Sequence, residues 1–244
     1  MKVNLFYLGL TLIALLVECL VHDLIEPVAA SFWSNNLRII SSLILAAWYY
    51  QMQKSSFYTP EKWMLVSILL PIVISLTMYL MLEKYAIIIN ITVNLTMLGI
   101  LIYCFKKLGA KINFKDSNDT FNKIFPAFFI FPFVFYFFVL YNALSGIYAI
   151  IVFIYVLIFS YTGILSVFLP INENKRLFII IGITLLVVAN IMNAYHTFLE
   201  KVPWGYPVIR TITVISRGMI IYGMARAIKY VEKSNQQPLR HVKV

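Results

Sequence analysis

Glu18 and His22 are the two residues of this sequence best suited to proton transfer, and they lie four positions apart in an apolar run. In a helix this spacing places two side chains on one face. The pair could act as an acid and a base at the mouth of a cavity within a membrane. It could equally lie at the membrane interface, with both polar ends directed toward the lipid headgroups. The catalytic residues are unknown from the sequence, and these two are the candidates.

Amide side chains also recur at helical spacing. Asn90 and Asn94 lie four positions apart, and Asn190, Asn193 and Thr197 follow one another at spacings of three and four. Such residues form hydrogen bonds between membrane helices, worth about 0.6 kcal/mol each, or they line a cavity that holds a polar ligand. Hydrogen bonding between helices is the favoured interpretation for Asn90 and Asn94. Asn94, Asn190 and Asn193 are also predicted ligand-binding residues.

Arg210, Thr213 and Arg217 share one helical face in the last apolar run. Arg217 falls near the middle of the membrane, where insertion of a charged side chain costs about 2.5 to 3.5 kcal/mol, so it must face the interior. Two guanidinium groups could hold an anion such as a phosphate, because the guanidinium plane suits bidentate contacts. They could instead pair with Glu18 or with the asparagines. Arg210, near the outer end, is expected to extend toward the headgroups.

Familiar catalytic motifs are missing from the sequence. It has no Gly-rich phosphate loop, no Cys/His metal cluster, no nucleophile elbow and no HExxH motif. We therefore expect no metal and no cofactor. Cys19 and Cys104 should differ in depth by about 20 Å, which is far beyond the reach of a disulfide.

The composition predicts the elements that must position these residues. Of the 244 residues, 61% are hydrophobic and only 12% are charged, yet the net charge is +10. Soluble proteins have about 25% charged residues. The basic residues occupy short gaps between long apolar runs, a pattern typical of membrane proteins and not of proteins that bind nucleic acid. The sequence therefore predicts an all-α polytopic membrane protein with no nucleic-acid partner.

Apolar runs of about 20 residues, the length that crosses a bilayer, predict a single bundle of eight transmembrane helices that forms one domain, 1–244. A disordered basic tail is predicted at 234–244. The predicted spans are approximately Val3 to Val21, Leu37 to Met52, Trp63 to Leu82, Tyr85 to Phe105, Ile124 to Tyr141, Ile147 to Leu169, Leu177 to Phe198 and Pro207 to Ile228.

The distribution of basic residues predicts the orientation. Eight spans place fifteen of the 20 Lys and Arg residues on one side of the membrane and four on the other. Because Lys and Arg concentrate in cytoplasmic loops, we expect both termini in the cytoplasm, with a bacterial inner membrane as the location. A cleaved signal peptide ending near Ala29 and Ala30 is an alternative to the first span, and its cleavage would leave the orientation of the rest unchanged.

The last three spans carry a family resemblance. Tyr148 to Ile151 open span six, Gly182 to Asn190 form a glycine-led apolar run in span seven, and Thr213 and Arg217 follow in the final helix. Over about 100 residues this pattern resembles the YhhN/lysoplasmalogenase family of eight-span membrane proteins. The resemblance implies a membrane enzyme that hydrolyses the vinyl ether of lysoplasmalogens.

Two acidic positions of that family are changed here. The family has a Gly-Asp in span three and a Ser-Asp in span seven, whereas this chain reads Pro71 to Met78 without a carboxylate and has Asn190 in span seven. Vinyl ether hydrolysis requires a proton donor to carbon, for which a carboxylic acid is suited and an amide is not. Either the site is rebuilt around Glu18 and His22, or the reaction has been lost.

These observations predict a protein that binds a membrane lipid or other amphiphile with an anionic head, including lyso-phospholipid, in an intramembrane cavity. Asn94, Asn190, Asn193 and Arg217 are the predicted binding residues. If the protein is an enzyme, it is a lysoplasmalogenase-like ether-lipid hydrolase. The alternative is a non-enzymatic transporter or a scaffold subunit of a membrane complex.

Overall fold

The protein is mainly helical in the part that the computed structural model describes, which comprises residues 2–24, 27–53, 59–79, 86–113, 123–144 and 146–236. Eight α-helices follow one another in this part, and a π-helical and a 3-10 segment continue the fifth helix. The segments are α1 (Lys2–Leu24), α2 (Pro27–Gln53), α3 (Thr59–Tyr79), α4 (Ala86–Lys107), α5 (Phe125–Phe135), η3 (Tyr136–Leu140), η4 (Tyr141–Ala143), α6 (Ile147–Val167), α7 (Glu173–Phe198) and α8 (Gly205–Gln236).

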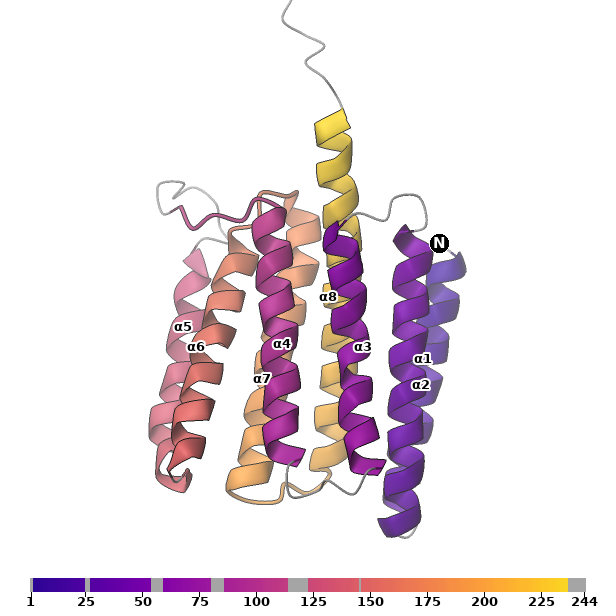
Figure 1. Ribbon diagram of the computed structural model, residues 1–244, viewed down its shortest axis with the longest axis vertical. Coiled ribbons are helices and arrows are strands. Elements are labelled where there is room, and N and C mark those ends of the chain that lie inside the picture. Colours follow the sequence, from indigo (N-terminus) through magenta and orange to yellow (C-terminus); the bar gives the residue numbers. More distant parts are fainter. Residues whose placement is uncertain are drawn as a thin grey trace, which may run out of the picture.

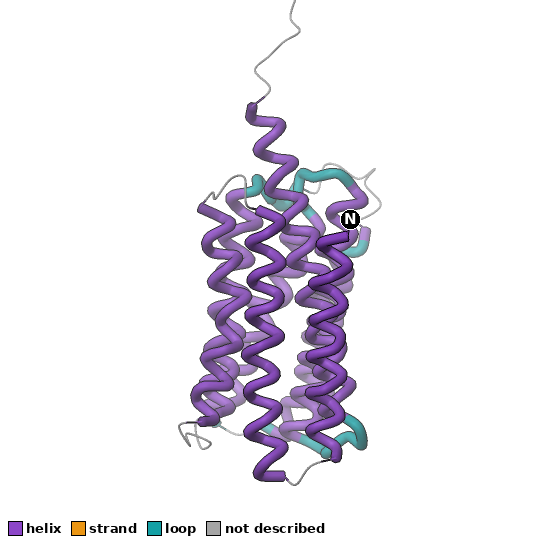
Figure 2. The backbone as a smooth tube through the Cα atoms, turned by 90° about the vertical axis from the view of Figure 1, so that its right-hand side faces the viewer, coloured by secondary structure: helices purple, strands orange, loops and turns teal. Residues whose placement is uncertain are grey.

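The helices stand side by side in one upright bundle (Figure 1). Successive helices run in opposite directions, so the start of α1 and the end of α8 lie at the same end of the bundle, which we name the terminal end. The last turns of α8 project beyond the other helices there, and the perpendicular view shows the same projection (Figure 2). The other end, where α1 meets α2 and α7 meets α8, is the distal end.

Six of the described helices are long and apolar enough to cross a membrane. They contain the stretches Pro60–Thr77, Ile87–Lys107, Phe125–Ala143, Ile147–Val167, Glu173–Phe198 and Gly205–Val231. The prediction of a helical multi-pass membrane protein is thereby confirmed. α1 contains a shorter apolar stretch, Phe6–His22, and the polar residues of α2 interrupt its apolar run, so eight crossings stay a prediction.

Two helix boundaries differ most from the predicted spans. α2 begins at Pro27 and not near residue 37, and α8 continues to Gln236, so residues 234–236 are helical and the predicted disordered tail is wrong there. Residues 237–244 lie outside the described part of the chain. The reason is that hydropathy marks where a helix meets lipid, whereas backbone hydrogen bonds and helix-forming side chains extend the helix past that limit.

Close packing of α7 on α8 sets the position of the polar faces of both helices. A Cβ atom placed on Gly182 would lie only 2.7 Å from the Ile220 side chain, and Ser216 donates a hydrogen bond to the Gly182 carbonyl oxygen at 2.8 Å. Small residues permit this approach between membrane helices. The contact holds the arginine face of α8 beside the asparagine face of α7.

The apolar core fills the half of the bundle nearest the terminal end. Its largest fully buried side chains include Tyr49 of α2, Phe105 of α4, Ile179 of α7 and Met224 of α8. Within the described helices, α8 packs on α7, α2, α1 and α3, while α4 packs on α3 and α6. The polar residues predicted to bind a ligand lie in the other half, where the packing leaves a cavity.

Candidate functional site

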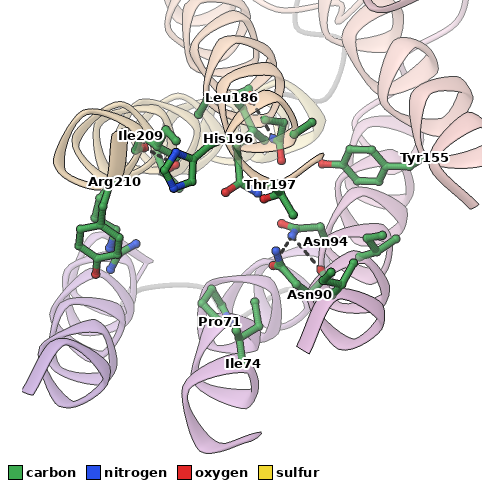
Figure 3. Close-up of a pocket in the computed structure, with 18 of the residues that line it drawn as sticks. Pro71, Ile74, Asn90, Asn94, Tyr155, Leu186, His196, Thr197, Ile209 and Arg210 are labelled. Carbon is green, nitrogen blue, oxygen red and sulfur yellow. Dashed lines mark hydrogen bonds between the residues drawn. The ribbon is translucent and has the colours of Figure 1, made fainter. Parts of the chain in front are cut away.

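A cavity of about 400 Å³ lies in the distal half of the bundle. Figure 3 shows polar side chains of α4, α7 and α8 converging on it, with Pro71 and Ile74 of α3 on another wall. Its apolar lining includes Pro71, Ile74, Ile87, Ile91, Val152 and Leu186, and its polar lining includes Arg38, Asn90, Asn94, Tyr155, Asn190, Asn193, His196, Thr197, Tyr206, Arg210, Thr213 and Arg217. The cavity therefore offers hydrogen-bond donors, positive charge and apolar surface together.

The four predicted ligand-binding residues, Asn94, Asn190, Asn193 and Arg217, all line this cavity. The amide of Asn94 donates to the Asn90 side chain at 2.9 Å and to the Asn90 carbonyl at 2.8 Å, and Asn190 donates to the Leu186 carbonyl at 2.7 Å. These bonds stay within one helix. The expected hydrogen bonds from Asn90 and Asn94 to another helix are not found among the described residues. Ligand binding by the four residues stays a prediction.

Arg217 lies at the inner end of the cavity and has no hydrogen-bond or ion-pair partner among the described residues; its Nε is buried and unpaired. Next to it, toward the terminal end, a void of about 20 Å³ is surrounded mainly by apolar side chains, among them Met64, Leu101 and Ile221. This apolar layer separates the cavity from the terminal end. Arg217 therefore lines the cavity with a guanidinium group that has no partner among the described residues.

The outer wall of the cavity is an ion-pair cluster around Glu18. Its Oε1 accepts hydrogen bonds from Arg210 Nε at 2.6 Å, from the Tyr206 hydroxyl at 2.7 Å and from Arg38 Nε at 3.4 Å. The Glu18 side chain is fully buried and that of Arg210 is 12% exposed. The expectation that Arg210 extends toward the headgroups is therefore wrong, because a buried carboxylate on α1 attracts it inward.

His22 packs flat on Tyr206, with ring centroids 3.8 Å apart and an interplanar angle of 6°. The residues that line the cavity in the described part of the chain include neither His22 nor Glu18, which lie behind Arg38, Tyr206 and Arg210. Glu18 is therefore not a headgroup-directed interfacial residue. Its position behind the wall gives it the role of a counter-ion that ties α1 to α2 and α8.

The sequence analysis gave no binding role to several residues of the site, among them Arg38, His196 and Tyr206. Arg38 is one of the four basic residues that the predicted orientation places opposite the termini, and its position one residue inside the predicted span Leu37 to Met52 was the available signal. His196 lines the cavity, and its Nδ1 accepts a hydrogen bond from the backbone N–H of Val202 at 3.0 Å. Tyr206 shares Glu18 with both arginines, and no sequence pattern distinguishes it from other interfacial tyrosines.

Metal chemistry has no evident ligand set in this part of the chain. The described residues include no group of three or more His, Cys, Asp or Glu side chains that could hold a metal ion, and no disulfide joins Cys19 and Cys104, which both lie in the described helices. The cationic and amide groups of the cavity are suited to binding an anion, and its apolar surface to binding a hydrocarbon group.

Fold and site together define a helical multi-pass membrane protein with a cationic internal cavity. Comparison of the chain with models of protein families, with curated proteins and with solved structures finds no match. The function is therefore inferred from the cavity and the sequence.

Proposed function

We propose that this protein binds an amphiphile with an anionic head in the distal cavity. The observation that carries the proposal is Arg217, a guanidinium inside the bundle that faces the cavity and has no partner among the described residues. An unpaired charge within a membrane protein is costly. A bound anion would repair this deficit and would explain why the residue is tolerated.

The remainder of the lining supports an amphiphile as the occupant. Asparagines and threonines surround the inner end, while Pro71, Ile74, Ile87 and Ile91 form an apolar wall on α3 and α4. A polar head bound beside Arg217 would leave its hydrocarbon chain against this wall. A lyso-phospholipid, which has one chain, combines these two parts, and the resemblance to lysoplasmalogenases supports the same class of ligand.

Hydrolysis is not part of the proposal. The cavity lining within the described residues contains no Asp or Glu, and Glu18, which lies behind the wall, directs Oε1 to three donors. A vinyl ether hydrolase needs an acid that reaches the substrate carbon. A scaffold role is also less well supported, because an arginine that joins helices would be paired, as Arg210 is.

Mass spectrometry of the protein purified in mild detergent tests the proposal. We expect a co-purifying lyso-phospholipid or one that binds saturably when added. We expect no release of fatty aldehyde from a lysoplasmalogen above a control without protein, because the cavity lacks an acid. The absence of any retained or added lyso-phospholipid on the protein would contradict the proposal of lipid binding. Release of fatty aldehyde would show instead that the protein is a hydrolase.

We also propose eight crossings in a bacterial inner membrane, with the terminal end in the cytoplasm. Lys106, Lys107, Lys111, Lys123 and Lys175 gather at or near that end, whereas Arg38 and Arg210 of the distal half turn inward to Glu18. Among the described residues of the distal end, few basic side chains therefore remain exposed. This asymmetry supports the orientation by the positive-inside rule.

Labelling of single cysteines with a membrane-impermeant maleimide tests this orientation. In a variant with Cys19 and Cys104 replaced by serine, we expect Lys201→Cys to react in spheroplasts and Lys111→Cys to react only after lysis, because these exposed residues lie at opposite ends. Ile25→Cys, between α1 and α2, should behave as Lys201→Cys if both helices cross. Reaction of Lys111→Cys in sealed spheroplasts would show that the orientation is opposite to the proposed one.

A further inference from the structure

The cavity carries a surplus of positive charge. Three guanidinium groups line it, those of Arg38, Arg210 and Arg217, and among the described residues the carboxylate of Glu18 pairs with the first two. The described site therefore has two positive charges in excess. The following inference rests on the proposed function and specifies the head of the ligand.

Other ionisable side chains on the lining do not offset this surplus. His196 accepts a hydrogen bond at Nδ1 from the Val202 N–H, and a histidine carries no negative charge that could offset the arginines. Tyr155 and Tyr206 are phenols, which are uncharged near neutral pH. Among the described residues, no further carboxylate balances the two excess charges, and an anion bound in the cavity would do so.

The surplus is concentrated along one face of α8. Arg210 and Arg217 are seven residues apart, which is about 10 Å along a helix, and the charge of Arg217 interacts electrostatically with Arg210, Arg38 and Glu18. In the low dielectric of a membrane protein, the repulsion between Arg217 and the other two arginines is weakly screened. An anion placed between these groups relieves the repulsion in proportion to its charge.

We infer that the ligand of this cavity is an amphiphile whose head is a phosphomonoester. A phosphomonoester carries about −1.5 to −2 charges at pH 7, which matches the surplus. The phosphodiester of a lysophosphatidylglycerol brings one negative charge. A zwitterionic head brings none in total, and its ammonium group would find no carboxylate on the described lining, because Glu18 lies behind the arginines.

The hydrogen bonds within the protein indicate which of the three arginines has donors left for the ligand. Arg210 donates from Nε to Glu18 and from Nη2 to Ser41, and Arg38 donates to Glu18 and Tyr206. Arg217 has all its donors free of described partners. The guanidinium fork of Arg217 thus holds the phosphate oxygens directly, while the other two arginines supply mainly charge.

Binding of four compounds to the detergent-purified full chain tests this inference. Lysophosphatidic acid, lysophosphatidylglycerol and lysophosphatidylethanolamine with the same acyl chain differ in head charge, and glycerol 3-phosphate carries the head without the chain. We expect lysophosphatidic acid to bind about tenfold more tightly than lysophosphatidylglycerol, the equivalent of one charge-assisted hydrogen bond, and the zwitterionic lipid to bind weakest.

The dependence on pH separates ligand charge from protein charge. The second ionisation of a phosphomonoester lies near pH 6, so the affinity for lysophosphatidic acid should rise between pH 5 and 7.5. The ionisable groups on the described lining are Arg38, Tyr155, His196, Tyr206, Arg210 and Arg217, with Glu18 behind them, and a change in the charge of any of them would affect the affinity for both lipids. Because the charge of lysophosphatidylglycerol is constant over this range, its affinity should rise less than that of lysophosphatidic acid, and an equal slope for both lipids overturns the inference.

Two variants test the charge balance directly. Asn193→Asp adds one negative charge to the lining, so the preference for lysophosphatidic acid over lysophosphatidylglycerol should fall to about parity. Arg226→Gln, an exposed position on the same helix outside the lining, should leave the preference unchanged. An unchanged preference in Asn193→Asp, with both lipids still binding, contradicts the assignment.

The outcomes distinguish this inference from the proposed function. If the three lipids bind equally, lipid binding stands and the phosphomonoester assignment falls. If none of them binds, both proposals fall. If glycerol 3-phosphate binds as tightly as lysophosphatidic acid, the phosphomonoester assignment holds and the amphiphile is replaced by a soluble phosphate ester.

Discussion

Glu18→Ala is expected to destabilise the protein by about 3 to 5 kcal/mol, the range found when one partner of a buried ion pair is removed. The carboxylate is fully buried and receives hydrogen bonds from Arg210, Arg38 and Tyr206 through one oxygen. Without it, two guanidinium groups remain near each other with no counter-charge. Because Glu18 is on α1 and its partners are on α2 and α8, the loss should loosen α1 from the bundle.

Thermal unfolding in detergent, followed by tryptophan fluorescence, measures this effect. Glu200→Ala is the matched control, since Glu200 lies near the same end of the bundle but is exposed. Glu18→Gln should fall between the two, because the amide oxygen still accepts hydrogen bonds while the charge is lost. A melting temperature for Glu18→Ala equal to that of Glu200→Ala would show that the cluster contributes nothing to stability.

Arg217→Ala is expected to lose lipid binding and keep its stability, in contrast to Glu18→Ala, which is expected to lose stability. Removing a charge-assisted hydrogen bond costs about 1.5 to 3 kcal/mol, which corresponds to a loss of about tenfold to a hundredfold in affinity for the anionic lipid. Among the described residues, Arg217 has no partner that its removal would leave unpaired. Its removal also deletes an uncompensated charge, so the melting temperature without lipid should be unchanged or higher.

Titration of lipid binding and thermal unfolding of the same preparations test this profile. Arg226→Ala removes an exposed arginine from the same helix and should alter neither property. Arg217→Lys should recover part of the affinity, because the charge is kept and the planar fork is lost. A fall in melting temperature for Arg217→Ala as large as that for Glu18→Ala would show that Arg217 holds helices together and would remove the basis of the proposed function.

The polar positions of α7 and α8 were predictable because their cause is local. Asn190, Asn193 and Thr197 follow a helical period, as do Arg210, Thr213 and Arg217, and a charge in the middle of an apolar run must face inward wherever the other helices lie. That reasoning needs only the sequence of one helix. It correctly placed Arg217 inside the bundle and on a face shared with Arg210.

The partners of these residues were not predictable, because they lie far apart in the chain. Arg210 and Glu18 are 192 positions apart and Arg38 and Tyr206 are 168 apart, so no spacing rule connects them. The side chain of an arginine near a helix end can extend to the lipid headgroups or pair with a buried carboxylate. Only the packing of α1 and α2 against α8 decides which of these partners Arg210 has.

The sequence by itself determined that this chain is a bundle of apolar helices and where its charges are concentrated, because hydropathy and helical periodicity are properties of each segment alone. The tertiary structure decided which charges are neutralised. Packing brings Glu18 to Arg38 and Arg210 and leaves Arg217 without a described partner beside a cavity. That difference follows from the relative placement of α1, α2 and α8, and the proposed function depends on it.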